Sequence, residues 1–181
     1  MAKGKSKGKG GGGGGAATIT GTNNADTINF INKQVKDLGL KSNVVFEFRD
    51  RKSSDGRVGG FVSFSNTFVK ETLDSGYFPH KDKVTIINNS SMPQKGTIAH
   101  ELKHIEQMQS GRFRYVAFKE NGKWVKGYEW NGKLHTTEKQ YKSIQTALKK
   151  AKTQEQYDKA LARYQSLPWE KEAYAAGDKY K

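Results

Sequence analysis

Cysteine is absent from the 181-residue chain, which excludes disulfides, zinc fingers with cysteine ligands and cysteine nucleophiles. Any metal site must therefore use His, Asp or Glu. Long hydrophobic runs are also missing. No stretch approaches the roughly 20 apolar residues that cross a bilayer, and mean hydropathy is −0.86. Acidic residues are few: 18 Asp and Glu face 32 Lys and Arg, so the net charge is +14. That excess favours polyanionic or acidic partners.

The first sixteen residues differ from the rest of the chain. Eight of the 20 glycines lie in residues 1–15, with four lysines and no acidic residue. Too few apolar side chains are present to offset the entropy lost on ordering, so residues 1–16 are predicted to be a disordered tail. A solubilising leader and a basic arm that contacts nucleic-acid phosphates both fit this composition. The lysines of such an arm are Lys3, Lys5, Lys7 and Lys9.

Residues 17–181 are predicted to form one α+β domain. Apolar residues recur at helical spacing from Ile28 to Leu38, and Asn24 or Asp26 can cap the start of that helix. Alternating apolar and polar residues then indicate strands. The elements expected in this half are a helix at about 24–38, strands at 43–50, 57–65 and 83–89, and a helix at about 92–109.

The second half begins with a hairpin pattern. Asn121-Gly122 joins two strand-like runs, and Asn-Gly favours the tight turn of a β-hairpin. The remainder has helical spacing. The elements expected here are strands at 112–119 and 123–130, a helix at about 141–151, a helix capped by Thr153 with Gln156, and a last helix that starts at Pro168.

One HExxH motif is present, His100-Glu101-Leu102-Lys103-His104. On a helix, positions i and i+4 share a face, so both imidazoles can reach one ion. Glu101 lies beside that face and can take a proton from an attacking water. We therefore predict His100 and His104 as metal ligands, Zn²⁺ as the metal and Glu101 as the catalytic base.

The surroundings of the motif favour this interpretation over chance. Random placement of four His and ten Glu would give roughly 0.005 such matches in this chain. Ser91 and Gln94 form a potential capping box, with Pro93 in the first turn. Apolar residues at positions 98, 102 and 105 form a stripe that would pack on a sheet and leave the motif facing a cleft. Two histidines and a glutamate on an ordinary surface helix are the alternative.

Two short strings resemble a known superfamily. TIAHELKHIEQ resembles the active-site helix of zincin metallopeptidases, and LPWEKEAYA resembles the glutamate-bearing helix of the gluzincin branch. Together they cover about twenty residues and are most similar to small phage or bacterial zincin-like peptidases. The resemblance implies a small twisted sheet, an HExxH helix, C-terminal helices, a zinc ion and peptide-bond hydrolysis.

The third ligand is open to three candidates. Metzincins are disfavoured, because Gln107 and Ser110 stand where their pattern needs Gly and His. Glu170 and Glu172 are two apart on one helix and point about 200° from each other, so only one should bind metal. In similar peptidases the ligand glutamate is often followed three residues on by Ala, which favours Glu170 and leaves Glu172 second. His135, after the hairpin, would instead give a three-histidine site.

Two tyrosines are further site candidates. Tyr174, one turn from Glu170, would support the ligand glutamate where similar peptidases more usually have an acid. Tyr128, on a predicted strand, could stabilise a developing oxyanion, although packing is the commoner role of such a residue. Gln107, one turn beyond His104, could touch the site or the substrate.

Two functions follow from these patterns. The first is a zinc-dependent metallopeptidase that acts on a protein or peptide, with an extended substrate added to a sheet edge at 59–65 or 84–88. The alternative is a basic nucleic-acid- or capsid-associated protein, conceivably of a phage, with a structural or degenerate metal site. We find no signal peptide or membrane span, which favours a cytoplasmic or virion-associated protein over a classically secreted one.

Overall fold

The computed structural model describes residues 17–40, 44–50, 60–63, 66–68, 75–77, 83–88 and 94–180. Helices and strands are mixed in these ranges, so the fold class is α+β, as predicted. The expected tail at residues 1–16 and the expected cap around Pro93 lie outside the described residues.

A four-stranded sheet forms the first half of the described fold. Its strands, in sheet order, are β1 (Thr18–Thr20), β2 (Val45–Asp50), β6 (Lys83–Asn88) and β3 (Gly60–Ser63). The first three run parallel, and β3 pairs antiparallel with β6. Strand 84–88 is therefore internal and not an edge. β3 lies at the end of the strand order, so the other expected edge strand, at 59–65, does form an edge of the sheet. Two short strands, β4 (Asn66–Phe68) and β5 (Ser75–Tyr77), pair separately.

Two helices pack with this sheet around the first core. Helix α1 (Ala25–Asp37) starts as expected, because the Asn24 side chain accepts a hydrogen bond of 2.9 Å from the Thr27 N–H. Helix α2 (Gln94–Gln109) carries the HExxH motif. The predicted apolar stripe of α2 is fully buried. Its residues join the inward face of β2 and β6; the core contains Ile31, Val35, Leu40, Val44, Phe46, Phe48, Val84, Ile86, Ile98, Leu102 and Ile105.

The second half is a three-stranded meander followed by three helices. Its elements are β7 (Phe113–Glu120), β8 (Lys123–Trp130), β9 (Lys133–Thr137), α3 (Glu138–Lys150), α4 (Gln154–Gln165) and α5 (Pro168–Asp178). Asn121 and Gly122 both have positive φ, as the predicted hairpin turn requires. Strand β9 was not expected, although Asn131-Gly132 repeats the same turn pattern with positive φ. Pro168 opens α5 as predicted.

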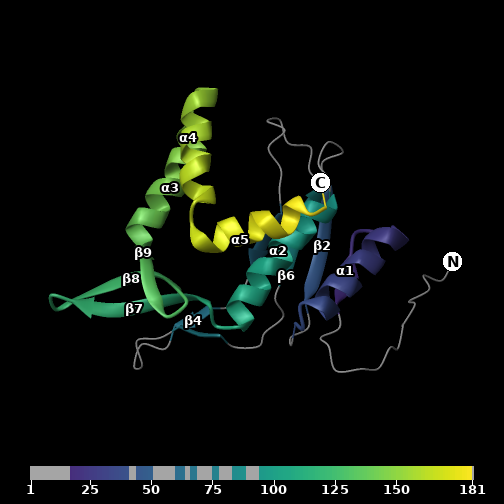
Figure 1. The fold of residues 1–181 in the computed structure, drawn as a ribbon, viewed down its shortest axis with the longest axis horizontal. Coiled ribbons are helices and arrows are strands. Elements are labelled where there is room, and N and C mark those ends of the chain that lie inside the picture. Colours follow the sequence, from purple (N-terminus) through teal and green to yellow (C-terminus); the bar gives the residue numbers. More distant parts are fainter. Residues whose placement is uncertain are drawn as a thin grey trace.

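A second core of mainly aromatic side chains holds this half together. Buried Trp169, at the start of α5, is its centre. The other members come from the meander and from α3 and α4; they are Ile144, Leu167, Phe113, Tyr128, Trp130, Tyr141 and Tyr164. Trp169 thus belongs to the second core, while α5 itself lies along α2 of the first core (Figure 1).

Close contact between α2 and α5 depends on small residues. A Cβ added at Gly177 would lie 2.7 Å from the backbone oxygen of Gly96, closer than real Cβ atoms come to any atom. The two helices therefore approach each other backbone to backbone at this point. This contact fixes α5 beside the motif helix.

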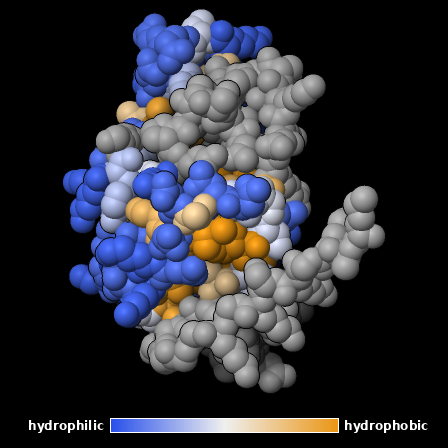
Figure 2. All heavy atoms as spheres, turned by 90° about the vertical axis from the view of Figure 1, so that its right-hand side faces the viewer, coloured by the Kyte–Doolittle hydropathy of each residue, from blue (hydrophilic) through white to orange (hydrophobic). Residues whose placement is uncertain are grey.

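The surface at the α1 end is mostly hydrophilic in its described part, and its largest hydrophobic area lies near the middle of the view (Figure 2). Partly buried hydrophobic residues of the first core are Ala17, Ile19, Phe30 and Leu38. In the part of the chain that the structure describes, no helix combines the length and the apolar character needed to cross a membrane.

Candidate metal centre

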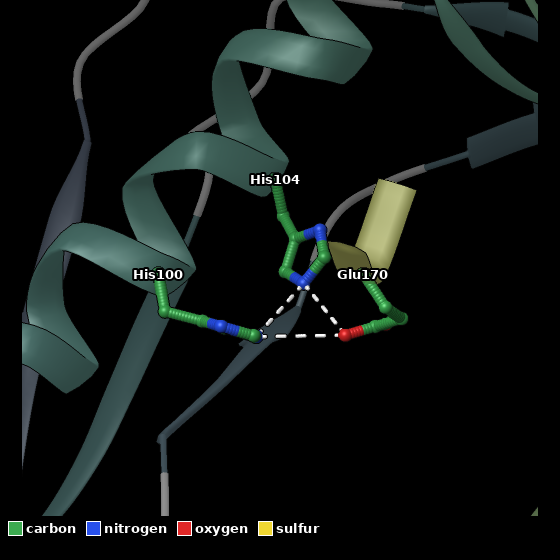
Figure 3. Close-up of side chains that lie close together, drawn as sticks. All are labelled: His100, His104 and Glu170. Atoms are coloured by element: carbon green, nitrogen blue, oxygen red, sulfur yellow. Dashed lines mark hydrogen bonds and ion pairs between the residues drawn. The ribbon is translucent and has the colours of Figure 1, made fainter. Parts of the chain in front are cut away.

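Two histidines and a glutamate converge between α2 and α5. His100 and His104, one turn apart on α2, point toward Glu170 in the first turn of α5 (Figure 3). The two Nε2 atoms are 3.2 Å apart, and each lies 3.5 Å from Glu170 Oε2. Among the described residues, this is the one group of three His, Asp or Glu side chains arranged to share a cation.

The spacing of these three atoms fits a zinc ion. Tetrahedral coordination at about 2.0–2.2 Å places neighbouring ligand atoms about 3.3–3.6 Å apart. The observed separations of 3.2, 3.5 and 3.5 Å match one face of such a tetrahedron. A fourth position would remain for water or substrate, as catalytic zinc sites require.

Glu170 is a buried carboxylate with an unsatisfied atom. Its side chain is 3% exposed, and Oε2 makes no hydrogen bond. Burial raises the pKa of Glu170, but the two imidazoles and the Tyr164 hydroxyl outweigh burial and lower the pKa to about 2. The carboxylate is therefore ionised at neutral pH. A buried, ionised oxygen that lacks a donor is well suited to bind a cation.

Tyr164, from α4, supports this carboxylate. Its hydroxyl lies beside Glu170 and Tyr141, and its single proton lowers the pKa of Glu170 when it is directed at that carboxylate. Burial, followed by the charge of Glu170, raises the pKa of Tyr164, so the hydroxyl keeps its proton and remains a donor. The second core thus helps to hold the third ligand in place.

The other side of His104 faces Gln107. His104 Nδ1 lies 3.0 Å from Gln107 Oε1, and Gln107 is fully buried. Burial lowers the pKa of His104, but Glu170, Glu101 and the bond to Gln107 together raise it. The local field therefore favours positive charge at this imidazole, as it would favour a metal ion.

Glu172 occupies different surroundings from Glu170. Its oxygens lie 2.9 and 3.0 Å from Arg112 Nη1, and Oε2 accepts a 2.9 Å bond from Gln107 Nε2. Arg112 also donates to Glu106 at 2.6 Å, and Lys103 lies 2.8 Å from the same carboxylate. Lys103 and Glu106 are partners in this ion-pair network. The structure places Glu172 there and Glu170 against the two histidines.

Glu101 is 6% exposed and lies within electrostatic reach of both histidines. Burial raises its pKa, and His104 and His100 lower it in part, with a net rise. A carboxylate whose pKa is moved toward neutrality is better matched to give and take protons near pH 7.

The remaining predicted site residues lie in three places. Tyr174 packs edge-on against His100, with ring centroids 4.6 Å apart. Tyr128 packs in the second core against Tyr141 and Trp169. None of the contacts described for Tyr128 joins it to the two histidines or to Glu170. His135 is exposed, has a ring contact with Trp169 and lines a groove of about 640 Å³ with Lys139 and Arg163. The expected arm of Lys3, Lys5, Lys7 and Lys9 lies outside the described residues.

Sequence reasoning missed two supporting residues, Tyr164 and Arg112. Tyr164 lay in the helix predicted to start at Thr153, where nothing distinguished a tyrosine that supports a carboxylate from a packing one. Arg112 was only the first residue of a predicted strand. Arg112 acts on Glu172, 60 residues along the chain, and Tyr164 reaches Glu170 across the break between α4 and α5, so helical periodicity could not have revealed either contact.

Comparisons with family models, with curated proteins and with solved structures gave no match to this chain.

Proposed function

We propose that this protein is a zinc-dependent metallopeptidase with a zincin-like fold. The observation that carries the proposal is the triangle formed by His100 Nε2, His104 Nε2 and Glu170 Oε2, with sides of 3.2, 3.5 and 3.5 Å. All three side chains are oriented by their own helices, and Glu101 adjoins them. This set of residue types is the one that the HExxH motif and the late glutamate led us to expect.

The three ligands would hold the metal, and Glu101 would transfer protons. A zinc ion held by His100, His104 and Glu170 would act as a Lewis acid on a peptide carbonyl and lower the pKa of water. Glu101 would accept a proton from the attacking water and deliver it to the leaving amine. Burial of Glu101 supports this role, because the raised pKa makes its protonated form accessible during the cycle.

An extended peptide would bind at strand β3 (Gly60–Ser63). This strand ends the order β1-β2-β6-β3, so one side of its backbone has no partner among the four strands. β3 also packs against α2, which carries the motif. Addition of a substrate strand to such an edge is a common way to hold a peptide by its main chain.

The test compares hydrolysis of an unfolded protein by the zinc-loaded wild type and by Glu101→Gln. The variant is expected to keep its zinc and to lose about 10²- to 10⁴-fold in rate, because the proton acceptor is gone while the ligands remain. Peptide release is measured by mass spectrometry, with zinc content determined on the same samples.

Glu106→Gln is the matched control, because it is the same change on the same helix. Glu106 pairs with Arg112 and Lys103 and has no described contact with the two histidines. This variant should cleave at the wild-type rate. Equal cleavage by Glu101→Gln and the wild type would contradict the proposed mechanism.

A further inference from the structure

Gln107 engages its amide oxygen and both of its N–H donors inside the protein. Its side chain is fully buried. Oε1 lies 3.0 Å from His104 Nδ1, while Nε2 donates to the Trp169 carbonyl and to Glu172 Oε2, both at 2.9 Å. An amide has one acceptor oxygen and two N–H donors, so each of them is engaged.

The partners of Nε2 fix which way the amide points. A carbonyl and a carboxylate can only accept, so the NH₂ group must face them. The amide oxygen must then face His104, and His104 Nδ1 must carry the proton. In the neutral ring this leaves the lone pair on Nε2, the nitrogen that faces His100 and Glu170.

The same side chain joins the two helices that supply the ligands. Gln107 lies on α2, three residues after His104, and Trp169 immediately precedes Glu170 on α5. Its bond to the Trp169 carbonyl therefore holds the backbone beside Glu170 at a fixed distance from His104.

We propose that Gln107 is the positioning residue of the metal centre, which holds His104 in the Nδ1–H form and sets the distance between α2 and α5. The inference rests on the proposed function, since it concerns the same ligands. A buried acceptor on the far ring nitrogen orients a histidine ligand and increases its basicity. Here the acceptor is an amide that is itself held by Glu172, and Arg112 in turn holds Glu172.

The test measures zinc affinity by competition with a chelator in four full-length proteins: wild type, Gln107→Met, Gln107→Glu and Gln109→Met. Gln107→Met keeps the length of the side chain but removes the acceptor, and should weaken zinc binding about 10- to 100-fold. Gln107→Glu keeps an acceptor for His104 but loses both donors and brings a second carboxylate to Glu172, so its loss of affinity should be clearly smaller than that of Gln107→Met but not zero. Gln109→Met is the matched control, the same change about 200° around the same helix, and should also match the wild type.

A purely structural role of Gln107 predicts a different ranking of the variants by zinc affinity. If Gln107 only ties α2 to α5, Gln107→Glu must lose as much affinity as Gln107→Met, because both lack the two donors. That result would overturn the proposal, as would equal affinities for Gln107→Met and Gln109→Met.

Ring-nitrogen NMR of the zinc-loaded proteins gives a readout that does not depend on the stability of a variant. The wild type should show a His104 Nδ1–H that exchanges slowly with water, and Gln107→Met should show fast exchange or none. Zinc bound through Nδ1, or no Nδ1–H in the wild type, would overturn the proposal even if Gln107→Met did not fold. If the wild type binds no zinc, the proposed function fails as well. If the wild type binds zinc and the Gln107 variants bind it equally tightly, only this inference fails.

Discussion

Glu170 is the residue on which the candidate centre depends most. Two histidines on one helix turn are a common arrangement, and the third ligand distinguishes a metal site from two surface imidazoles. Glu170 is buried, ionised and within 3.5 Å of both Nε2 atoms. Burying such a charge without a partner would be strongly unfavourable. The two imidazoles and, after them, the Tyr164 hydroxyl make this placement tolerable.

Tyr164→Phe tests that support. Removal of the hydroxyl leaves the buried carboxylate with one donor fewer, so we expect zinc affinity to fall about tenfold or more. Tyr180→Phe is the matched control and should leave affinity unchanged, because the Tyr180 hydroxyl accepts a hydrogen bond from Gln34 of α1 instead. Affinity is measured by chelator competition. Identical affinities for the two variants would refute a supporting role for Tyr164.

At the same scale, the sequence predicted which three side chains come together, but not the residues that surround them. The spacing of His100 and His104 and the position of Glu101 follow from one five-residue string. The choice of Glu170 over Glu172 came from a resemblance, and the structure brings Glu170 to the two histidines. The partners of Glu172 could not be predicted, because Arg112 is 60 residues away and meets it only through the packing of α5 on α2.

Among the elements, the contact between α2 and α5 positions the site. The ligand atoms lie on two helices whose register is fixed near one end by Gly96 and Gly177, and near the other by the bonds of Gln107. A change in the separation of these helices would therefore change the distance from Glu170 to both histidines.

Gly177→Ala tests the close contact between α2 and α5. By helix propensity alone, alanine would stabilise α5 by up to about 1 kcal/mol. The added Cβ would instead lie 2.7 Å from a backbone oxygen of α2, so we expect a net loss of about 1–3 kcal/mol in the free energy of unfolding. Urea unfolding measures the change. Ala175→Gly, on an exposed position of α5, controls for propensity; a stabilised Gly177→Ala would disprove the close contact.

Local patterns predicted elements well where the chain itself fixes the geometry. The Asn24 cap, the Asn121-Gly122 turn and the Pro168 start are confirmed because each depends on a few neighbouring residues. The capping box at Thr153 is half right: Thr153 caps α4, but the Gln156 side chain bonds to the Lys152 N–H. A complete box forms at Thr137 and Gln140 instead, at the start of α3. Strand β1, three residues long, has too short a pattern to predict.

Over the whole molecule, two cores meet at the candidate centre. α2 belongs to the core built on the four-stranded sheet, whereas Trp169, next to Glu170, is the centre of the aromatic core. A metal ion bound here would link the two cores. No single segment of the sequence contains this arrangement, because it appears only when α5 packs back on α2 (Figure 1).

Charge is unevenly spread along the chain. Residues 112–165 hold 13 Lys and Arg against 5 Asp and Glu, so they contribute +8 of the net +14. The excess is therefore not confined to the four lysines near the N-terminus. An acidic substrate of the proposed peptidase would be attracted to this half, and so would the nucleic acid of the alternative function, whose binding would weaken steeply with salt.

The most direct test of the central claim is zinc content per chain after dialysis, for the wild type and for His104→Ala, Glu170→Gln and Glu172→Gln. Glu172→Gln is the matched control for Glu170→Gln, since it is the same change two residues along the same helix. We predict about one zinc in the wild type and in Glu172→Gln, and none retained by the other two. No zinc in the wild type, or loss of zinc from Glu172→Gln with retention by Glu170→Gln, would contradict the assigned site.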